Sequence, residues 1–132
     1  MAALTDKQRQ FLAENPFVGV ATTLREDGSP HSTVVWVDAD GGVSFNTARG
    51  RAKERNLARD PRVSLLVVDP QNAYRWVSVT GHAELVDDGA DEQIDKLAKK
   101  YLGADTYPWR SASERRVSVR ITPERIDSTG LD

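Results

Sequence analysis

The sequence predicts a mainly β protein that folds as a small β-barrel with a few short flanking helices. Six segments rich in valine, isoleucine and threonine recur along the 132 residues, separated by turns that contain glycine, proline, asparagine or aspartate. Closure of such a sheet removes its exposed edges, which favours a barrel over an open sheet. The length fits one domain, residues 1–132, with one hydrophobic core.

The first part of the chain predicts one helix and three strands. Thr5 and Gln8 have the spacing of a capping box, which opens a helix that Pro16 ends. The connections between the next segments are too short for crossover helices, so we expect an antiparallel meander. The three predicted strands cover residues 17–24, 31–37 and 43–47.

The second part predicts two helices and three strands. Asp60 and Pro61 end the first helix, because the residue before a proline avoids the helical region. Gly81 interrupts the apolar face of a long strand and predicts a bulge there. Apolar residues at helical spacing define the second helix, which Gly103 ends. The predicted strands cover residues 62–69, 74–86 and 115–122, the second helix covers residues 91–102, and a short tail follows from Pro123.

Composition excludes several classes of protein. The net charge is −2 and the isoelectric point about 5.7, whereas a nucleic-acid-binding domain is usually clearly basic. The chain has no cysteine, which excludes disulfides and thiolate chemistry. No apolar stretch is long enough to span a membrane, and the polar residues 1–15 are unlike a secretory signal. We therefore expect a cytoplasmic protein that binds neither nucleic acid nor membrane.

A basic cluster, residues 49–57, opens the first of the two later helices. A helix start carries exposed N–H groups and a partial positive charge, so cations there are unfavourable unless an anion binds between them. A phosphate held by Arg51 and Lys53 would satisfy both the helix and the side chains. The alternative is a solvated helix on which Glu54 neutralises part of the charge. The cluster alone leaves both interpretations open.

Side chains that commonly carry out catalysis are scattered. His31 and His82 have no second histidine or carboxylate at ligand spacing, so we expect strand or surface positions for both. No serine stands in a nucleophile-elbow motif, and no glycine-rich loop of the Walker or Rossmann kind is present. If the protein is an enzyme, a bound cofactor must supply the reactive atom.

Three groups of residues are candidates to surround a flat ring. Hydroxyls, backbone groups, aromatic faces and a cation are the features they offer. Packing in the core or between subunits explains Trp36, Tyr74 and Trp76 equally well. The groups are Ser32, Thr33 and Val34 on the second strand, Asn46 and Thr47 on the third, and Tyr74, Arg75 and Trp76 at the start of the long strand.

Residues 51–64, RAKERNLARDPRVS, are the most specific motif in the chain. This segment looks like the RAK-x-RN-L-x-x-DPR motif of the pyridoxamine-phosphate-oxidase-like proteins, which have a split β-barrel, FMN-binding-like fold. Residues 19–22, 27–30 and 79–85 support the resemblance, which extends over residues 17–126. Within that superfamily the chain resembles the short actinobacterial branch that uses the deazaflavin coenzyme F420.

The resemblance implies a homodimer with cofactor sites at the subunit interface. Arg51 and Lys53 would bind the cofactor phosphate, the second and third strands would line its ring, and the start of the long strand would reach it from the other subunit. The cofactor-binding residues expected on this basis are Ser32, Thr33, Val34, Trp36, Asn46, Thr47, Arg51, Ala52, Lys53, Tyr74, Arg75, Trp76 and Val77.

These expectations lead to one main functional hypothesis. The protein is an oxidoreductase in which reduced F420 delivers a hydride to an unsaturated small-molecule substrate, so that no catalytic side chain and no metal are needed. An FMN-dependent oxidase or reductase is the second hypothesis, because both cofactors carry a phosphate. A non-catalytic protein that binds a flavin, a deazaflavin or haem is the third.

Overall fold

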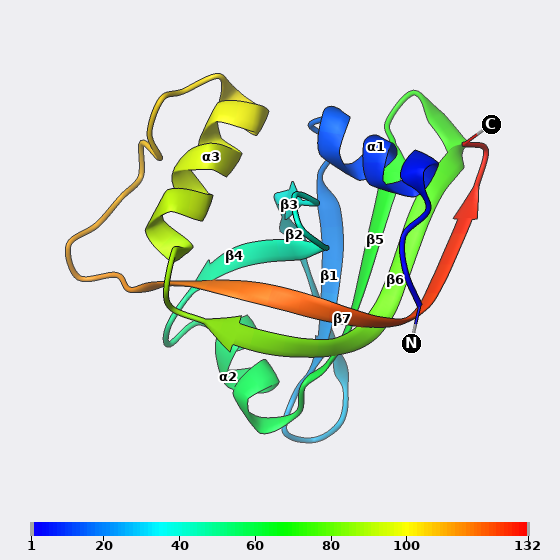
Figure 1. Cartoon of the computed structure of the whole chain (residues 1–132). Helices are drawn as coiled ribbons and strands as arrows, with labels where there is room; N and C mark the ends of the chain where they lie inside the picture. The colour runs from blue at the N-terminus through cyan, green and yellow to red at the C-terminus, as the bar shows by residue number, and fades with distance from the viewer. Residues whose placement is uncertain (1, 132) are drawn as a thin grey trace.

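The computed structural model describes residues 2–131 and confirms the predicted mainly β fold (Figure 1). Seven strands form one antiparallel sheet in the order β2-β1-β5-β6-β7-β4-β3. The strands are β1 (Gly19–Leu24), β2 (Pro30–Val35), β3 (Val37–Asp38), β4 (Ser44–Ala48), β5 (Arg62–Asp69), β6 (Asn72–Val86) and β7 (Arg116–Thr129). The helices are α1 (Asp6–Glu14), α2 (Ala52–Arg59) and α3 (Ala90–Leu102).

Trp36 marks the corner at which the sheet closes on itself. The two edge strands, β2 and β3, are consecutive in the sequence, and only Trp36 separates them. The chain therefore passes from one edge of the sheet to the other at this residue. The long strands β6 and β7 sweep across the sheet and curl it into a half-barrel (Figure 1). Curling brings both edges of the sheet to the side that faces α3.

The predicted meander is wrong beyond its first hairpin. β1 and β2 pair as expected, but β4 pairs with β7 and not with β2. The reason is that the strand predicted over residues 31–37 breaks at Trp36. Its last part becomes β3, which forms a second hairpin with β4 at the opposite edge of the sheet.

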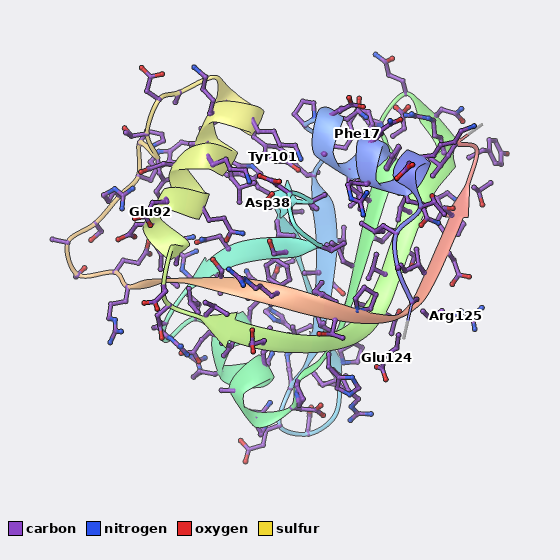
Figure 2. The ribbon with its side chains drawn as sticks, in the orientation of Figure 1. Phe17, Asp38, Glu92, Tyr101, Glu124 and Arg125 are labelled. Carbon is purple, nitrogen blue, oxygen red and sulfur yellow. The ribbon has the colours of Figure 1, made fainter. Side chains whose placement is uncertain are left out.

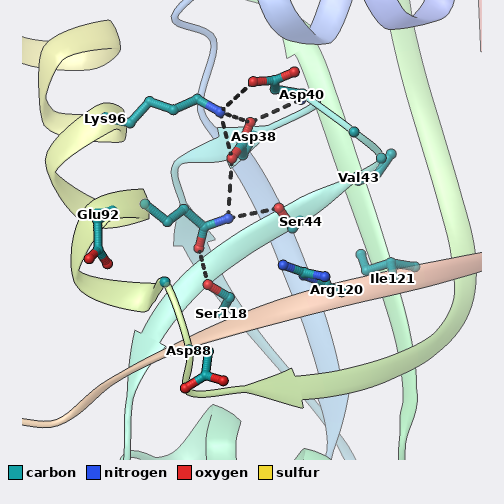
Figure 3. Close-up of a pocket in the computed structure, with 14 residues that line it drawn as sticks. Asp38, Asp40, Val43, Ser44, Asp88, Glu92, Lys96, Ser118, Arg120 and Ile121 are labelled. Atoms are coloured by element: carbon teal, nitrogen blue, oxygen red, sulfur yellow. Dashed lines mark hydrogen bonds and ion pairs between the residues drawn. The ribbon is translucent and has the colours of Figure 1, made fainter.

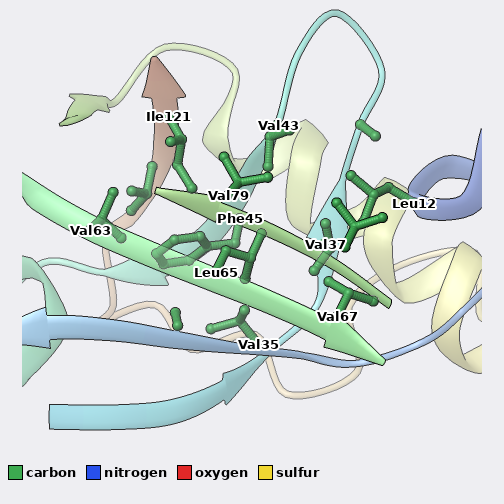
Figure 4. Close-up of a cluster of buried hydrophobic side chains, with 14 of the residues drawn as sticks. Leu12, Val35, Val37, Val43, Phe45, Val63, Leu65, Val67, Val79 and Ile121 are labelled. Atoms are coloured by element: carbon green, nitrogen blue, oxygen red, sulfur yellow. The ribbon is translucent and has the colours of Figure 1, made fainter. Parts of the chain in front are cut away.

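The core lies inside the curl of the sheet. Ala21, Leu65 and Val79 are register neighbours on β1, β5 and β6 and are at most 1% exposed. Phe45 on β4 is fully buried and lies among them (Figure 4). Burial of apolar surface contributes about 25 cal/mol per Å². The contacts of Phe45 with these side chains therefore help to pack β4 against the β1, β5 and β6 part of the sheet.

A bulge bends β6 and β7 at Gly81, as predicted. A Cβ on Gly81 would lie 2.0 Å from the carbonyl oxygen of Thr122, so only glycine allows this approach. The pairing shifts from Thr80 to Gly81 and leaves Glu124 as the extra residue, on the outside of the bend (Figure 2). The predicted short tail is wrong, because β7 continues past Pro123 to Thr129. The register shift accommodates a proline that has no N–H to donate.

The first helix covers one end of the barrel. Its predicted capping box is present: the Gln8 N–H donates to the Thr5 hydroxyl at 3.1 Å, and the Thr5 N–H donates to the Gln8 side chain at 2.9 Å. Phe11 and Leu12, both 2% exposed, pack from α1 into the core. Within residues 2–131, no helix is long and apolar enough to cross a membrane.

The third helix is fastened to the barrel corner through Tyr101. Its hydroxyl donates to the Phe17 carbonyl at 2.7 Å and accepts from the Val37 N–H at 2.9 Å (Figure 2). Burial raises the pKa of Tyr101, so the hydroxyl keeps its proton and its role as donor. α3 is thereby held beside Trp36.

Candidate functional site

A cavity of about 170 Å³ lies at the corner where β2, β4, the start of α2 and α3 meet. The connection between α3 and β7, residues 103–115, also contributes to its wall. Because it contains three cationic side chains, we call it the cationic pocket. Its lining residues are Val34, Val35, Trp36, Asn46, Thr47, Arg51, Lys53, Ile94, Leu97, Tyr107, Trp109 and Arg116.

The three cations are Arg51, Lys53 and Arg116. Arg51 is the N-cap residue of α2, and its side chain makes no capping hydrogen bond to the helix. Burial lowers the pKa of Lys53, and the nearby charges of Arg51 and Arg116 lower it further. A lysine pKa depressed in this way indicates electropositive surroundings. A helix start and converging cations together favour a bound anion.

Thr47 adds a hydrogen-bond donor to the same pocket. The residue is 1% exposed, and its side-chain oxygen has no hydrogen-bond partner. An unpaired buried hydroxyl costs about 1–3 kcal/mol of folding free energy. Such a group persists more readily where a ligand supplies the missing acceptor, and a phosphate oxygen near Arg51 and Lys53 would do so.

Arg116 is held in place by two partners, Glu114 and Asn46. Its side chain is only 6% exposed and pairs with Glu114 at 2.6 Å. Its Nε atom donates to the Asn46 side chain at 2.8 Å, and Asn46 in turn donates to Gln93 at 3.0 Å. A buried guanidinium fixed in this way presents its remaining donors in one orientation, which suits an anion.

Glu54 neutralises part of the charge of the basic cluster, as the alternative interpretation expects, but at Arg49 and not at Lys53. Its carboxylate lies 3.6 Å from Arg49 and accepts from the Gly50 N–H at 3.3 Å. Arg49 also pairs with Asp87 through two hydrogen bonds of 3.0 and 2.9 Å. The solvated-surface interpretation therefore fits Arg49, whereas Lys53 is half-buried in the pocket.

Aromatic side chains also line the cationic pocket. Trp36 is stacked on Tyr101, with ring centres 5.4 Å apart and planes within 10°. Tyr107 and Trp109 contact the same indole at 6.2 and 6.5 Å. Aromatic faces beside an anion site suit a ligand that has both a planar ring and a phosphate.

Six residues expected from the sequence meet in this pocket: Val34, Trp36, Asn46, Thr47, Arg51 and Lys53. Three others lie beside it. The Ser32 hydroxyl is within 2.8 Å of the Thr22 hydroxyl on the outer face of the sheet. Thr33 has a buried hydroxyl without a partner, and Ala52 begins α2.

The remaining expected residues lie on β6, which β1 and β5 separate from β2. Tyr74 is 81% exposed, and Trp76 lines a separate groove on the outer face of the sheet. Arg75 pairs with Asp69 at 3.1 Å and lies over the Phe11 ring. The Val77 side chain belongs to the core. Within one chain these four residues do not reach the cationic pocket.

Besides Val35 on the second strand, sequence analysis missed five residues that line the pocket. Ile94 and Leu97 had been assigned only to the buried face of a helix. Tyr107 and Trp109 lie in an irregular connection where no periodic pattern applies. Arg116 was placed on the polar face of the last strand, yet it is buried. The aromatic residues at positions 107 and 109, close together in a loop, were the one available signal.

A second, larger hollow of about 420 Å³ lies on the other side of Gln93, and we call it the Asp38 pocket (Figure 3). Lys96 donates to Asp38 at 3.1 Å and to Asp40 at 3.1 Å. Gln93 donates to Asp38 at 3.2 Å and to Ser44 at 2.8 Å. These groups satisfy one another, so the network fastens α3 to the sheet without requiring a ligand.

The comparisons with known proteins agree with this architecture. The family model described as pyridoxamine 5'-phosphate oxidase matches residues 4–130. The F420H(2)-dependent biliverdin reductase of Mycobacterium tuberculosis (strain CDC 1551 / Oshkosh) is 27% identical over 124 residues, which cover 93% of this chain and 86% of that protein.

Two solved structures are similar over most of their length. One described as an F420 reductase is 30% identical, covers 89% of this chain and 94% of its own, and superposes with a TM-score of 0.78. A conserved hypothetical protein from Mycobacterium tuberculosis is 27% identical, with coverages of 98% and 86% and a TM-score of 0.74. The chain therefore belongs to the pyridoxamine 5'-phosphate oxidase family and has the split β-barrel, FMN-binding-like fold.

Proposed function

We propose that the protein is an F420-dependent oxidoreductase that reduces an unsaturated organic substrate. The observation that carries the proposal is the cationic pocket, in which three cations and an unpaired threonine hydroxyl lie together with aromatic side chains. The likeness to an F420 reductase and to an F420H(2)-dependent biliverdin reductase supports F420 as the cofactor.

The residues divide into two roles in this proposal. Arg51, Lys53 and Arg116 neutralise the phosphate, and the Thr47 hydroxyl donates a hydrogen bond to it. Trp36, which is stacked on Tyr101, orients the ring and excludes water from its face. The reduced deazaflavin supplies the hydride when it is bound, and the chain supplies position and shielding.

FMN is the second candidate cofactor, because its phosphate would use the same cations and hydroxyl. Parallel fluorescence titrations of the purified protein with F420 and with FMN test the choice. The proposal expects saturable binding of F420, and tighter binding of F420 than of FMN. Tighter binding of FMN would overturn the choice of cofactor.

Turnover with reduced F420 tests the activity. The acceptors to assay are biliverdin, quinones and enones, which together cover the unsaturated classes that a hydride can reduce. Consumption of reduced F420 that depends on one of these acceptors would support the proposal. Binding of F420 without turnover of any acceptor would favour a non-catalytic binding protein.

We also propose that the protein is a homodimer. Val34, Val20 and Leu66 are register neighbours on β2, β1 and β5 and are 64%, 38% and 40% exposed on the outer face of the sheet. Such an apolar row on a protein surface indicates an interface. Val34 also lines the cationic pocket, so a second copy on this face would lie against the ligand and offer its own Tyr74 segment.

Sedimentation analysis of Leu66→Glu tests the dimer. A charge in the apolar row should produce monomers and weaken F420 binding, because the site loses the part that the second copy supplies. Ala13→Glu on the exposed face of α1 is the matched control and should remain dimeric. A wild-type protein that sediments as a monomer with full F420 affinity would overturn this proposal.

A further inference from the structure

Glu114 does not line the cationic pocket itself, but it bridges two of the pocket's three cations. One of its oxygens accepts a hydrogen bond from Arg51 at 2.7 Å, and the other accepts one from Arg116 at 2.6 Å. These are the two guanidiniums that a ligand phosphate would use. Carboxylates and phosphates bind guanidinium donors through the same paired geometry, so they compete for them.

The same segment covers the aromatic end of the pocket. Glu114 belongs to the connection of residues 103–115, which runs from the end of α3 to β7 as an irregular loop (Figure 1). Tyr107 and Trp109 in this connection pack against Trp36. One segment therefore closes both the anion site and the ring site.

With residues 103–115 in place, the hollow that one chain provides is small for a deazaflavin. The cationic pocket holds about 170 Å³, whereas pockets for cofactor-sized ligands hold roughly 300–1,000 Å³. The barrel strands and α3 that form the rest of the wall are fixed by the core. The segment of residues 103–115 lies outside the helices and strands, so it is the part of the wall that can move to enlarge the pocket.

The attachments of this segment to α3 lie at the surface. Arg110 pairs with Asp95 at 2.5 Å and with Asp91 at 3.1 Å, and the Tyr107 N–H donates to Asp95 at 2.8 Å. Partly exposed ion pairs contribute little to stability. A segment held in this way opens at lower cost than the strands beneath it.

We propose that residues 103–115 form a strap that Glu114 locks over the cofactor site. The inference rests on the proposed function, because it assigns the regulation of the same site. The ligand phosphate replaces the Glu114 carboxylate on Arg51 and Arg116, which releases the strap and withdraws Tyr107 and Trp109 from the ring site. Closed and open forms are in equilibrium, and the closed fraction weakens the apparent affinity for the ligand.

Glu114→Gln is the direct test. Glutamine keeps the size of the side chain and removes the charge that competes with the phosphate. The apparent Kd for F420 should fall by at least about fivefold, because the phosphate no longer has to displace a charged carboxylate that pairs with both Arg51 and Arg116. The same variant should bind inorganic phosphate more tightly. Glu92→Gln, an exposed position of α3 that lines the Asp38 pocket, is the charge-matched control and should bind both as the wild type does.

Tryptophan fluorescence follows the movement of the strap. Addition of phosphate alone to the wild type should change the emission of Trp36 and Trp109, because the strap leaves Trp36 when Glu114 is displaced. Asp95→Asn loosens the strap at its other attachment and should raise the association rate of F420. An unchanged or weaker affinity in Glu114→Gln, with no emission change on phosphate binding, would overturn the inference and assign Glu114 to holding the arginines in position.

Titrations with inorganic phosphate and with F420 distinguish a failure of the strap from a failure of the proposed function. Phosphate binding that tightens in Glu114→Gln, in a protein that binds neither F420 nor FMN, supports the strap and overturns the oxidoreductase. F420 binding to the wild type that does not tighten in Glu114→Gln overturns only the strap. A wild-type protein and a Glu114→Gln variant that bind neither anion nor cofactor overturn both.

Discussion

The two pockets on either side of Gln93 differ in how their charges are balanced. In the Asp38 pocket, Lys96 is shared between two carboxylates, and the amide of Gln93 satisfies what remains. In the cationic pocket, three cations face the single carboxylate of Glu114, and a buried hydroxyl has no acceptor. The network around Asp38 is therefore satisfied within the protein, whereas the cationic pocket has a surplus of positive charge.

If the cationic pocket holds the cofactor, as we propose, volume is a poor guide to the binding site in this barrel. A surplus of one charge and an unpaired buried donor both identify the side that a ligand completes. Gln93 joins the two sides, because it bonds Asp38 in one pocket and Asn46 in the other. The hydrogen bonds around Asp38 thus help to hold Gln93 and Asn46, and through them the side chain of Arg116 in the cationic pocket.

Removal of the buried amine should have the largest effect on binding. Lys53→Ala should weaken F420 binding by about 1.5–3 kcal/mol, the range for a hydrogen bond to a charged group. Arg51→Ala should act in the same direction. Folding stability should be unchanged or slightly higher, because a cation leaves the start of a helix. Titration and denaturant unfolding measure the two effects, and unchanged affinity in both variants would remove the phosphate assignment.

A substitution in the Asp38 pocket should lower folding stability and leave F420 binding unchanged, the reverse of what we expect for Lys53→Ala. Lys96→Ala removes the cation beside Asp38, whose side chain is 9% exposed. The free energy of unfolding should fall by about 1–2 kcal/mol, because the buried carboxylate loses a charged donor. The affinity for F420 should stay at the wild-type value. A loss of affinity as large as that of Lys53→Ala would show that the two pockets are not separate in function.

Thr47→Val should move folding and binding in opposite directions. Valine has nearly the shape of threonine and lacks the unpaired hydroxyl, so unfolding in denaturant should become harder by up to about 1 kcal/mol. F420 binding should weaken by about 1 kcal/mol, since one donor to the phosphate is lost. Thr23→Val is the control: its hydroxyl accepts from Asn56 at 3.0 Å, so this variant should lose stability instead. A Thr47→Val protein that is also less stable would contradict an unpaired hydroxyl.

The smallest effect is expected from pH. The pKa of Lys53 is lowered by burial and by Arg51 and Arg116, so this amine loses its proton at lower pH than an ordinary lysine. F420 affinity should fall as pH rises through that pKa, by no more than Lys53→Ala removes. Lys53→Arg stays charged throughout and should abolish the fall. The linked effect on folding has the opposite sign: stability increases over the same range, because the unfolded chain binds more protons there.

The sequence predicts the parts of this molecule that local rules determine. The capping box at Thr5, the end of α2 at Asp60 and the bulge at Gly81 each follow from one or two residues. The motif over residues 51–64 predicts the helix start and two cations of the pocket. The break at Trp36 and the pairing of β4 with β7 depend on long-range contacts, and alternation along one strand does not reveal them.

The missed part of the candidate site has a similar cause. Arg116 lies on the predicted strand of residues 115–122, and its burial depends on contacts with Asn46, Glu114 and Tyr107 that the alternation of that strand does not reveal. Tyr107, Trp109 and Glu114 lie in a loop without periodicity, so their meeting with Trp36 and Arg51 is a tertiary event.

The position of Trp36 between the two edge strands has a consequence for the order of assembly. The indole that we propose to face the ligand also connects the two edge strands, β2 and β3, so the ring site exists only after these strands have formed. Ligand binding should then stabilise both strands against local unfolding. In hydrogen exchange, the amides of β2 and β3 should gain the most protection when F420 is added, while those of β5 and β6 stay as they were.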